Sequence, residues 1–372
     1  MTEHPDWAYA ATLTQVPGCG TTTAFRLLVL HDPQEAFERA AAEARSHGAR
    51  VDVDEVGRMR ERCEELAIDV AWVRGPGFPL VVAASPGPCG VFFYRGDTDL
   101  FAGRRVGIVG TRTPTPSGVY TAREIGEGLS LAGVHVVSGL AKGIDGAAHD
   151  GVRAALDPSV ASSHGRAIAV VGSGLDVVYP RANASLWEWV AQHGLLMSEH
   201  PPGAPAEPHH FPRRNRLIAA LSEVVVVVES RESGGSMSTV RQAIERQRDV
   251  LAVPGSPRVV SAAGTNLLIQ QGCGAVTCAA DILSVLALDH RHIDAMTRDE
   301  RAAPDPRDVV VLDACSRGPV TLDHLMIATG RTLADLALAL GRLEATGWVV
   351  EEAGWWEALL LRRGRHADEF IS

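Results

Sequence analysis

The apolar positions of the chain follow two different spacings, and the change between them divides the sequence. Up to about residue 66, apolar residues recur every three or four positions, as in Ala36–Ala44 and Val53–Ala67, which predicts helices and no strand. From residue 105 onward, short continuous runs of Val, Ile and Ala alternate with segments of helical length. Such runs are typical of strands that are buried on both faces of a sheet. The predicted strands are Arg105–Gly110, Val134–Gly139, Ala167–Gly172, Leu195–Ser198, Glu223–Glu229 and Val250–Val253.

The alternation of strands and helices predicts an α/β core with a Rossmann-like, doubly wound and mostly parallel sheet. A lead-in at about 67–100 is interrupted by Gly and Pro. Within this lead-in the sequence predicts two short extended pieces, Leu80–Ala84 and Val91–Tyr94.

The end of the chain has a pattern of its own. Asp289–Asp308 is polar, charged and Pro-containing, as linkers are. Three helices and a ribbon that turns at Ala353-Gly354 follow, and this order is the winged-helix arrangement. The predicted elements are helices Val309–Ser316, Thr321–Ala328 and Thr332–Thr346, and strands Trp348–Glu352 and Trp355–Leu361.

A chain of 372 residues fits two or three domains. We expect a small helical domain at 1–66, the Rossmann-like core at 67–288, a linker at 289–308 and a winged-helix-like domain at 309–372.

Net charge describes the whole chain poorly. The formal charge of −10 argues at first against a nucleic-acid partner, which usually meets a basic surface. Residues 1–65 and 289–372 each carry −5, whereas residues 66–288 carry 18 basic and 18 acidic side chains. The acidity therefore belongs to the flanks. Of the 35 basic residues 34 are Arg and one is Lys142, so a site for a polyanion in the core depends mainly on Arg.

The six cysteines form no C-x-x-C pair, which excludes a zinc knuckle and gives no disulfide framework. The N-terminus lacks the basic start and apolar stretch of a signal peptide. Apolar runs such as Val224–Val228 are too short to span a bilayer. These features predict a soluble cytoplasmic protein with no membrane partner.

Ligands of open parallel sheets bind beyond the carboxyl ends of the strands. Four predicted strands lead into segments rich in Gly and hydroxyl side chains, at 110–118, 138–145, 172–174 and 233–239. Glycine lets backbone amides approach an anion, and helix N-termini add partial positive charge. Four such loops at one edge predict a phosphate-binding site.

The segment after the fourth strand, residues 200–216, is rich in Pro and ends with Phe211 and three Arg. Arg makes bidentate contacts with phosphate, and an aromatic ring offers a stacking face for an unpaired base. The segment therefore indicates binding of single strands. An alternative is that Phe211 belongs to the core and that one or more of these Arg pair with acidic side chains.

No catalytic or cofactor signature accompanies these loops. Neither G-x-G-x-x-G nor G-x-x-x-x-G-K-[ST] occurs, so no dinucleotide or ATP is expected. Asp145 and His149 lie four residues apart, a spacing that favours a structural pair on one helix face. His209 and His210, near His200, have no carboxylate or Cys at ligand spacing, so no metal is expected.

The two ends carry weaker signals for DNA. Residues 13–28, with the turn Pro17-Gly-Cys-Gly20, resemble a helix-hairpin-helix (SAM-like) unit whose backbone amides can meet a phosphate. The acidity of the surrounding residues favours a structural hairpin instead. In the third C-terminal helix Arg342 is the single basic residue, which favours a packing or protein-contact module over a helix that recognises bases.

Taken in order, the loop motifs resemble the DNA-processing protein A (DprA/Smf) family. The resemblance covers about residues 67–288. It is carried by IVGTRTPTPSG (108–118), SGLAKGIDGAAH (138–149), GSGLDVVYPRAN (172–183), SEHPPG (198–203), FPRRNRLIAALS (211–222), ESGGSMST (232–239), VPGSP (253–257) and GTNLLIQQG (264–272).

The resemblance implies a core that binds single-stranded DNA without hydrolysing it, forms a homodimer and helps to load RecA recombinase during uptake of transforming DNA. No cofactor is implied. Together with the loop positions it gives these candidate binding residues: Gly110, Thr111, Arg112, Ser138, Gly139, Lys142, Gly172, Ser173, Gly174, Phe211, Arg213, Arg214, Asn215, Arg216, Gly234, Gly235 and Ser236.

Two other function classes are compatible with such a core. Nucleotide-processing phosphoribohydrolases resemble it at Gly234-Gly235 but use P-G-G-x-G-T-x-x-E, and here Arg241 or Gln242 stands where the catalytic Glu is expected. The missing carboxylate argues against hydrolysis. A winged-helix transcription regulator is disfavoured by the Arg-poor third helix.

Overall fold

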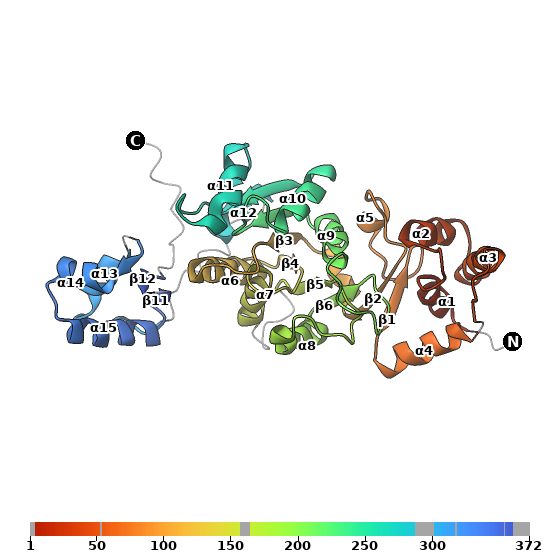
Figure 1. The fold of residues 1–372 in the computed structure, drawn as a ribbon, viewed down its shortest axis with the longest axis horizontal. Helices are drawn as coiled ribbons and strands as arrows, with labels where there is room; N and C mark the ends of the chain where they lie inside the picture. Colours follow the sequence, from red (N-terminus) through yellow and green to blue (C-terminus); the bar gives the residue numbers. More distant parts are fainter. Residues whose placement is uncertain are drawn as a thin grey trace.

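A mixed sheet of nine strands forms the centre of the protein (Figure 1). The computed structural model describes residues 4–52, 54–156, 164–286, 301–316, 318–352 and 354–359. The strand order is β1-β2-β6-β5-β4-β3-β7-β8-β9. The strands are β1 (Asp69–Trp72), β2 (Val91–Gly96), β3 (Arg105–Val109), β4 (His135–Ser138), β5 (Ala167–Val171), β6 (Leu195–Ser198), β7 (Val224–Val227), β8 (Asp249–Ala252) and β9 (Gly274–Ala275).

The direction of winding changes at β3. Strands β4, β5 and β6 follow one another on one side of β3, and β7, β8 and β9 follow on the other side. Neighbours from β6 to β9 are parallel, whereas β2 pairs antiparallel with both β6 and β1. The predicted mostly parallel α/β sheet is confirmed, and the reversal at β3 opens a crevice at the carboxyl ends of the strands.

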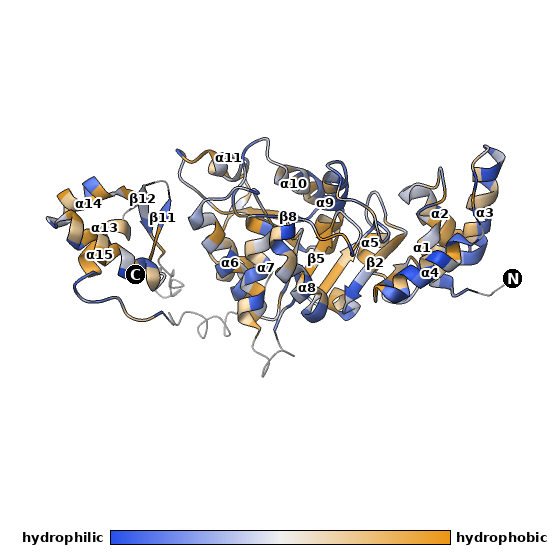
Figure 2. Cartoon of the chain, turned by 60° about the horizontal axis from the view of Figure 1, so that its bottom comes forward, coloured by the Kyte–Doolittle hydropathy of each residue, from blue (hydrophilic) through white to orange (hydrophobic). Residues whose placement is uncertain are grey.

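Successive residues of the central strands face opposite sides of the sheet, as the pleat requires. Ile108 and Val136 pack in one hydrophobic cluster, and their neighbours Val109 and Val137 pack in the other. The apolar strands lie between the helices (Figure 2). The first cluster is covered by α6 (Pro116–Leu131), α7 (Ile144–Ala155), α8 (Ala184–His193) and α12 (Ala279–Val285). The second is covered by α5 (Leu80–Ala83), α9 (His210–Leu221), α10 (Ser236–Glu245) and α11 (Ala263–Gln270).

The N-terminal region is helical, as its spacing predicts. It contains α1 (Asp6–Leu13), α2 (Thr21–Leu30), α3 (Pro33–Ser46) and α4 (Glu55–Glu65). Helix α1 packs against α3, α4 and β1, and residues 8–13 of α1 are buried. Apart from Thr12, these buried residues belong to the same hydrophobic cluster as the α6–α8 face of the core. The helical region therefore continues the core packing, and the boundary at residue 66 stays a prediction.

One local prediction in the core is wrong, and two strands were not predicted. Leu80–Ala83 is one turn of helix, α5, and not an extended piece, because β1 pairs with β2 at that edge while Val82 packs towards α9. The sequence pattern also missed β1 and the two-residue β9, because such short edge strands carry little periodicity.

The C-terminal elements agree closely with their predicted positions. Helices α13 (Val309–Ser316), α14 (Leu322–Thr329) and α15 (Leu333–Ala345) enclose a separate core. Strands β11 (Val349–Glu352) and β12 (Trp355–Ala358) pair, and β12 also pairs with the unpredicted β10 (Val320–Thr321). Ala353, part of the predicted linker (residues 289–300) and the predicted strand end at 360–361 lie outside the described residues. The winged-helix assignment stays a prediction.

No helix among the described residues is both long and apolar enough to cross a membrane.

Candidate nucleic-acid interface

A cavity of about 190 Å³ lies where the carboxyl ends of β3, β4 and β5 meet the start of α9. It brings together six of the candidate residues from four separate segments of the chain. The lining residues are Arg112, Thr113, Gly139, Ala141, Lys142, Val171, Gly172, Ser173, Tyr179, Pro180 and Phe211.

The Phe211 ring is the centre of an aromatic and cationic group in this cavity. The Arg112 Cζ atom lies 4.7 Å from the centroid of the Phe211 ring, within the range of a cation–π contact. The Tyr179 ring lies 5.6 Å away on a tilted plane. Gly172 leaves room for the ring, since a Cβ atom there would lie 3.3 Å from Phe211 Cδ1. The cavity thus presents an aromatic surface beside a guanidinium group.

Backbone contacts hold the loop that carries Arg112. The Thr111 amide donates to the Glu229 carbonyl at 2.7 Å, and the Ile144 amide donates to the Thr111 carbonyl at 3.2 Å. Gly143 has a φ of +83°, and a Cβ atom there would lie 2.4 Å from the Thr111 oxygen. Only glycine fits this approach, so the loops after β3 and β4 are fixed against each other.

The N-terminus of α6 is occupied by a side chain of the protein. Glu229, 8% exposed at the end of β7, accepts from the Thr115 amide at 3.0 Å and from the Thr115 hydroxyl. The hydroxyl oxygen of Thr115 in turn accepts from the Gly118 amide at 3.1 Å. A carboxylate therefore takes the place that a phosphate occupies at a helix N-terminus. For the 110–118 loop, the prediction of anion binding depends on Arg112 and not on the helix start.

We expect Glu229→Ala to lower the free energy of unfolding by about 2 kcal/mol, because the partly buried Thr115 donors lose their acceptor. Urea denaturation monitored by circular dichroism measures this change. The matched control is Glu232→Ala, an exposed residue of the same loop, which is expected to leave the midpoint unchanged. Equal midpoints for the two variants would show that Glu229 does not support α6.

Arg214 does not belong to the lining of this cavity. Its side chain is only 5% exposed, and Nη1 donates to the Gly139 carbonyl at 2.7 Å and to the Val170 carbonyl. Burial lowers the pKa of Arg214 to about 10, while Asp145 opposes this change. The Asp145 carboxylate accepts from the Gly139 amide at 3.2 Å. Burial raises the pKa of Asp145, and the nearby charge of Arg214 opposes the rise. Both groups therefore hold the loop at Gly139.

The neighbours of Arg214 on α9 have different surroundings. The Asn215 side-chain amide donates to Ser238 Oγ at 2.7 Å and thereby links α9 to α10. Arg216 forms an ion pair with Glu199, which is largely buried at the end of β6. This pairing agrees with the alternative in which part of the Arg group meets acidic side chains. Arg213 is exposed and faces a second cavity.

The remaining candidates fix the strand ends and loops. Ser138 is buried and its hydroxyl donates to the Ile108 carbonyl at 2.6 Å. Gly174 has no space for a side chain, because a Cβ atom would lie 2.6 Å from the Pro201 oxygen. In the loop after β7, Ser236 donates to Ser230 Oγ at 2.7 Å, whereas a Cβ atom at Gly235 would meet open space. This loop, including Gly234, lies outside the cavity lining, as does Gly110.

The histidines of the core have two kinds of environment. Burial lowers the pKa of His149 to about 4, so this fully buried side chain of α7 is neutral at pH 7 against strands β4 and β5. Near the surface, the expectation that no carboxylate stands at ligand spacing from His209 and His210 is wrong. The Glu207 carboxylate and one nitrogen of each ring lie within 4.8 Å of one another. Glu207 stands only two residues before His209 in the sequence, and a turn in which the His210 amide donates to the Glu207 carbonyl at 3.0 Å brings the carboxylate to the rings.

Two residues of the site were missed from the sequence. Tyr179 follows a Gly-Ser-Gly loop as part of the apolar run Val177-Val178-Tyr179, and only the tertiary fold turns it towards Phe211. Glu229 was assigned to the predicted strand Glu223–Glu229. A carboxylate directly after a run of five Val was the available signal.

The cavity lies in the part of the chain that a known family covers. The family model of DNA recombination-mediator protein A matches residues 70–287, more than half of the chain. The chain belongs to this family. Bacillus subtilis DNA processing protein DprA is 40% identical over 230 residues, covering 62% of this chain and 75% of that relative. Escherichia coli protein Smf is 34% identical over 294 residues, covering 77% of this chain and 76% of its own length.

Solved structures of DprA proteins have the same fold. The crystal structure of Streptococcus pneumoniae DNA processing protein A superposes with a TM-score of 0.63 at 28% identity, covering 76% of this chain and 98% of its own. Helicobacter pylori DNA processing protein A gives a TM-score of 0.52 at 27% identity, covering 59% and 95% of the two chains. The H. pylori structure is described for its single-stranded DNA binding mode.

Proposed function

We propose that this DprA family member is a recombination mediator that binds single-stranded DNA in the cavity around Phe211. The observation that carries the proposal is the Phe211 ring with the Arg112 guanidinium 4.7 Å from its centroid, at the carboxyl edge of the sheet. An aromatic face stacks on any base, and a guanidinium binds the adjacent phosphate. Paired bases do not offer their faces, so the arrangement selects unpaired strands.

Charge and relatedness support the same proposal. Lys142 is exposed at the rim and adds a second cation to Arg112. No acidic side chain belongs to the described lining of this cavity. The Helicobacter pylori relative, whose binding of single-stranded DNA is described, aligns with 59% of this chain.

The lining does not favour a phosphoribohydrolase. Hydrolysis of a glycosidic bond needs a carboxylate near the sugar to stabilise the developing positive charge. The buried Asp145 carboxylate accepts from the Gly139 amide, and Arg241 or Gln242 on α10 stands where the catalytic glutamate is expected. Binding without hydrolysis therefore fits these residues better.

Three parts of the proposal come from the family resemblance alone. They are the loading of RecA, a homodimeric state, and a role in handling incoming DNA during natural transformation. Light scattering with and without oligothymidylate measures the oligomeric state, and a strand-exchange assay with purified RecA measures loading.

The test of the proposed function compares fluorescent oligothymidylate with duplex of the same length. We expect tighter binding of the single strand, with affinity that falls as salt rises because bound phosphates release counterions. Lys142→Gln is expected to weaken binding severalfold and to reduce the salt slope by about 0.7, the value for one single-strand phosphate contact.

The matched control is Arg153→Gln, an exposed residue further along α7 that lies outside the cavity lining. This variant is expected to bind like the wild type. Equal affinity for the duplex and the single strand, or equal effects of the two substitutions, would contradict the proposal.

A further inference from the structure

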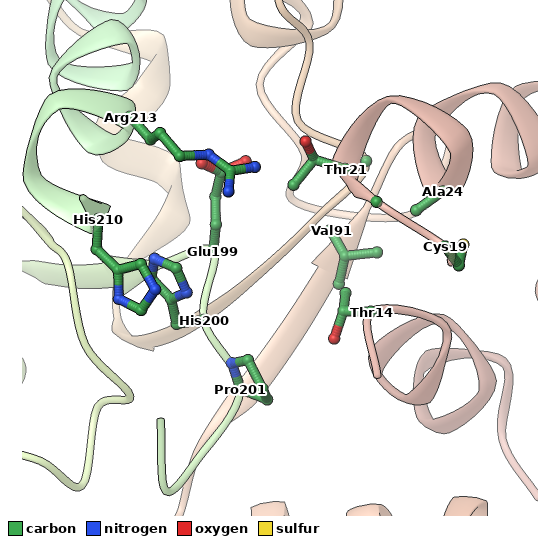
Figure 3. A pocket seen from close by; sticks show the side chains of 12 residues that line it. Thr14, Cys19, Thr21, Ala24, Val91, Glu199, His200, Pro201, His210 and Arg213 are labelled. Carbon is green, nitrogen blue, oxygen red and sulfur yellow. The ribbon is translucent and has the colours of Figure 1, made fainter. Parts of the chain in front are cut away.

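A second cavity, of about 250 Å³, lies between the N-terminal helices and the core (Figure 3). Five lining residues come from the helical hairpin of α1 and α2, and seven come from β2, the end of β6 and the start of α9. The hairpin side consists of Thr14, Cys19, Gly20, Thr21 and Ala24. The core side consists of Gly90, Val91, Glu199, His200, Pro201, His210 and Arg213.

His210 separates the second cavity from the first. Its Nδ1 atom lies 3.1 Å from the carbonyl of Gly172, which lines the cavity around Phe211. A Cβ atom at Gly172 would touch both Phe211 and His210. Phe211 and Arg213 are both in the first turn of α9 and line different cavities. A DNA strand that continues beyond a base stacked on Phe211 therefore meets the second cavity next.

Arg213 supplies the positive charge of the second cavity. It is exposed, and no carboxylate of the described residues forms an ion pair with it. Glu199, the acidic lining residue, is neutralised by its ion pair with Arg216. Burial lowers the pKa of His200 to about 4, so that ring is neutral at pH 7 and stacks on His210 with centroids 3.8 Å apart.

The hairpin side complements this guanidinium. Figure 3 shows Arg213 extending from α9 towards Thr21 of the helical hairpin. Thr21 begins α2, and no side chain caps the helix start. Ala24, Val91 and Pro201 give the rest of the lining an apolar part. Arg213 and the start of α2 offer a polar edge for a phosphate, and Ala24, Val91 and Pro201 offer an apolar wall for a base. The cavity therefore matches the two parts of a nucleotide.

We propose that the second cavity binds a further nucleotide of the DNA strand held at Phe211, with its phosphate between Arg213 and the start of α2. The inference depends on the proposed function, and it extends the DNA path from the core to the acidic N-terminal region. The helical hairpin then acts as one wall of a binding site, in addition to its packing on β1.

The test uses the full chain, Thr21→Glu and oligothymidylates of about 2 to about 16 nucleotides, the range of typical single-strand sites. A glutamate in the first turn favours the helix, so the variant retains its fold while adding a negative charge to the cavity. We expect wild-type affinity for the shortest strands and about fivefold weaker binding of strands long enough to reach both cavities. Arg213→Gln is expected to show the same length dependence.

The matched control is Thr22→Glu, which adds the same charge to an exposed neighbour outside the cavity. Identical affinities of Thr21→Glu and Thr22→Glu at every length would overturn the inference. Equal weakening by Thr21→Glu at all lengths would also overturn it, because the cavity would then not be a separate subsite. A wild-type chain that binds no oligothymidylate overturns the proposed function itself.

Crosslinking gives a second readout. A strand with a single 5-iodouracil, moved one position at a time, is expected to crosslink to the hairpin peptide of residues 14–24 at positions adjacent to those that crosslink near Phe211. Crosslinks confined to the core for every position would overturn the inference.

Discussion

Phe211→Ala is expected to weaken binding of oligothymidylate by about tenfold to hundredfold, since loss of one stacked base costs about 1–3 kcal/mol. The Phe211 ring is partly exposed and contacts Arg112 and Tyr179. Removing the ring takes away the stacking face and also the group that orients the guanidinium. Fluorescence anisotropy at fixed salt measures the change, and the melting temperature is expected to stay close to that of the wild type.

Two further substitutions separate stacking from packing. Phe211→Leu keeps an apolar side chain but has no aromatic face, so it is expected to bind as weakly as Phe211→Ala. Phe211→Trp retains the face and is expected to bind like the wild type. If Phe211→Leu binds with wild-type affinity, the ring serves packing and the proposed site around it is wrong.

Arg214→Met is expected to lower the free energy of unfolding by about 3 kcal/mol or more, the usual cost of breaking a buried charge interaction. The substitution removes the donor of the Gly139 and Val170 carbonyls. It also leaves the buried Asp145 carboxylate without the positive charge that opposes the rise of its pKa. Denaturation in urea measures the loss, which is expected to be accompanied by weaker DNA binding because the loop at Gly139 loses its support.

The matched control is Arg213→Met. Because Arg213 is exposed, this substitution is expected to leave the free energy of unfolding nearly unchanged. Adding Asp145→Asn to Arg214→Met is expected to restore part of the lost stability, since a neutral amide is less costly to bury than a carboxylate. Equal urea midpoints of Arg214→Met and the wild type would show that Arg214 does not support the fold.

These two predictions assign different roles to residues that are three positions apart. In the sequence, Phe211, Arg213, Arg214, Asn215 and Arg216 form one group at the end of a Pro-rich segment. In the structure they belong to one helix, and helical rotation turns them in different directions. Phe211 lines one cavity and Arg213 another, while Arg214 is buried against the loop at Gly139 and Asn215 against α10.

The sequence by itself determined the sheet and the edge at which the cavity lies. Continuous Val, Ile and Ala runs such as Val224–Val227 require burial on both faces, and their alternation with helices makes most strands parallel. Parallel strands bring the loops at their carboxyl ends to one edge, so Arg112, Lys142 and Gly172 were predicted together. These conclusions depend on periodicity and on chain connection, which are local properties.

Only the tertiary structure decided what each side chain at that edge contacts. Glu229 holds Thr115, the N-cap residue of α6, Arg216 pairs with Glu199, and the hairpin of α1 and α2 closes a second cavity against α9. Each of these contacts joins residues that are distant in the chain. Their partners are set by how the helices pack on the sheet, because local hydrophobic spacing fixes which face of a helix is buried but not which charged or polar group meets it there.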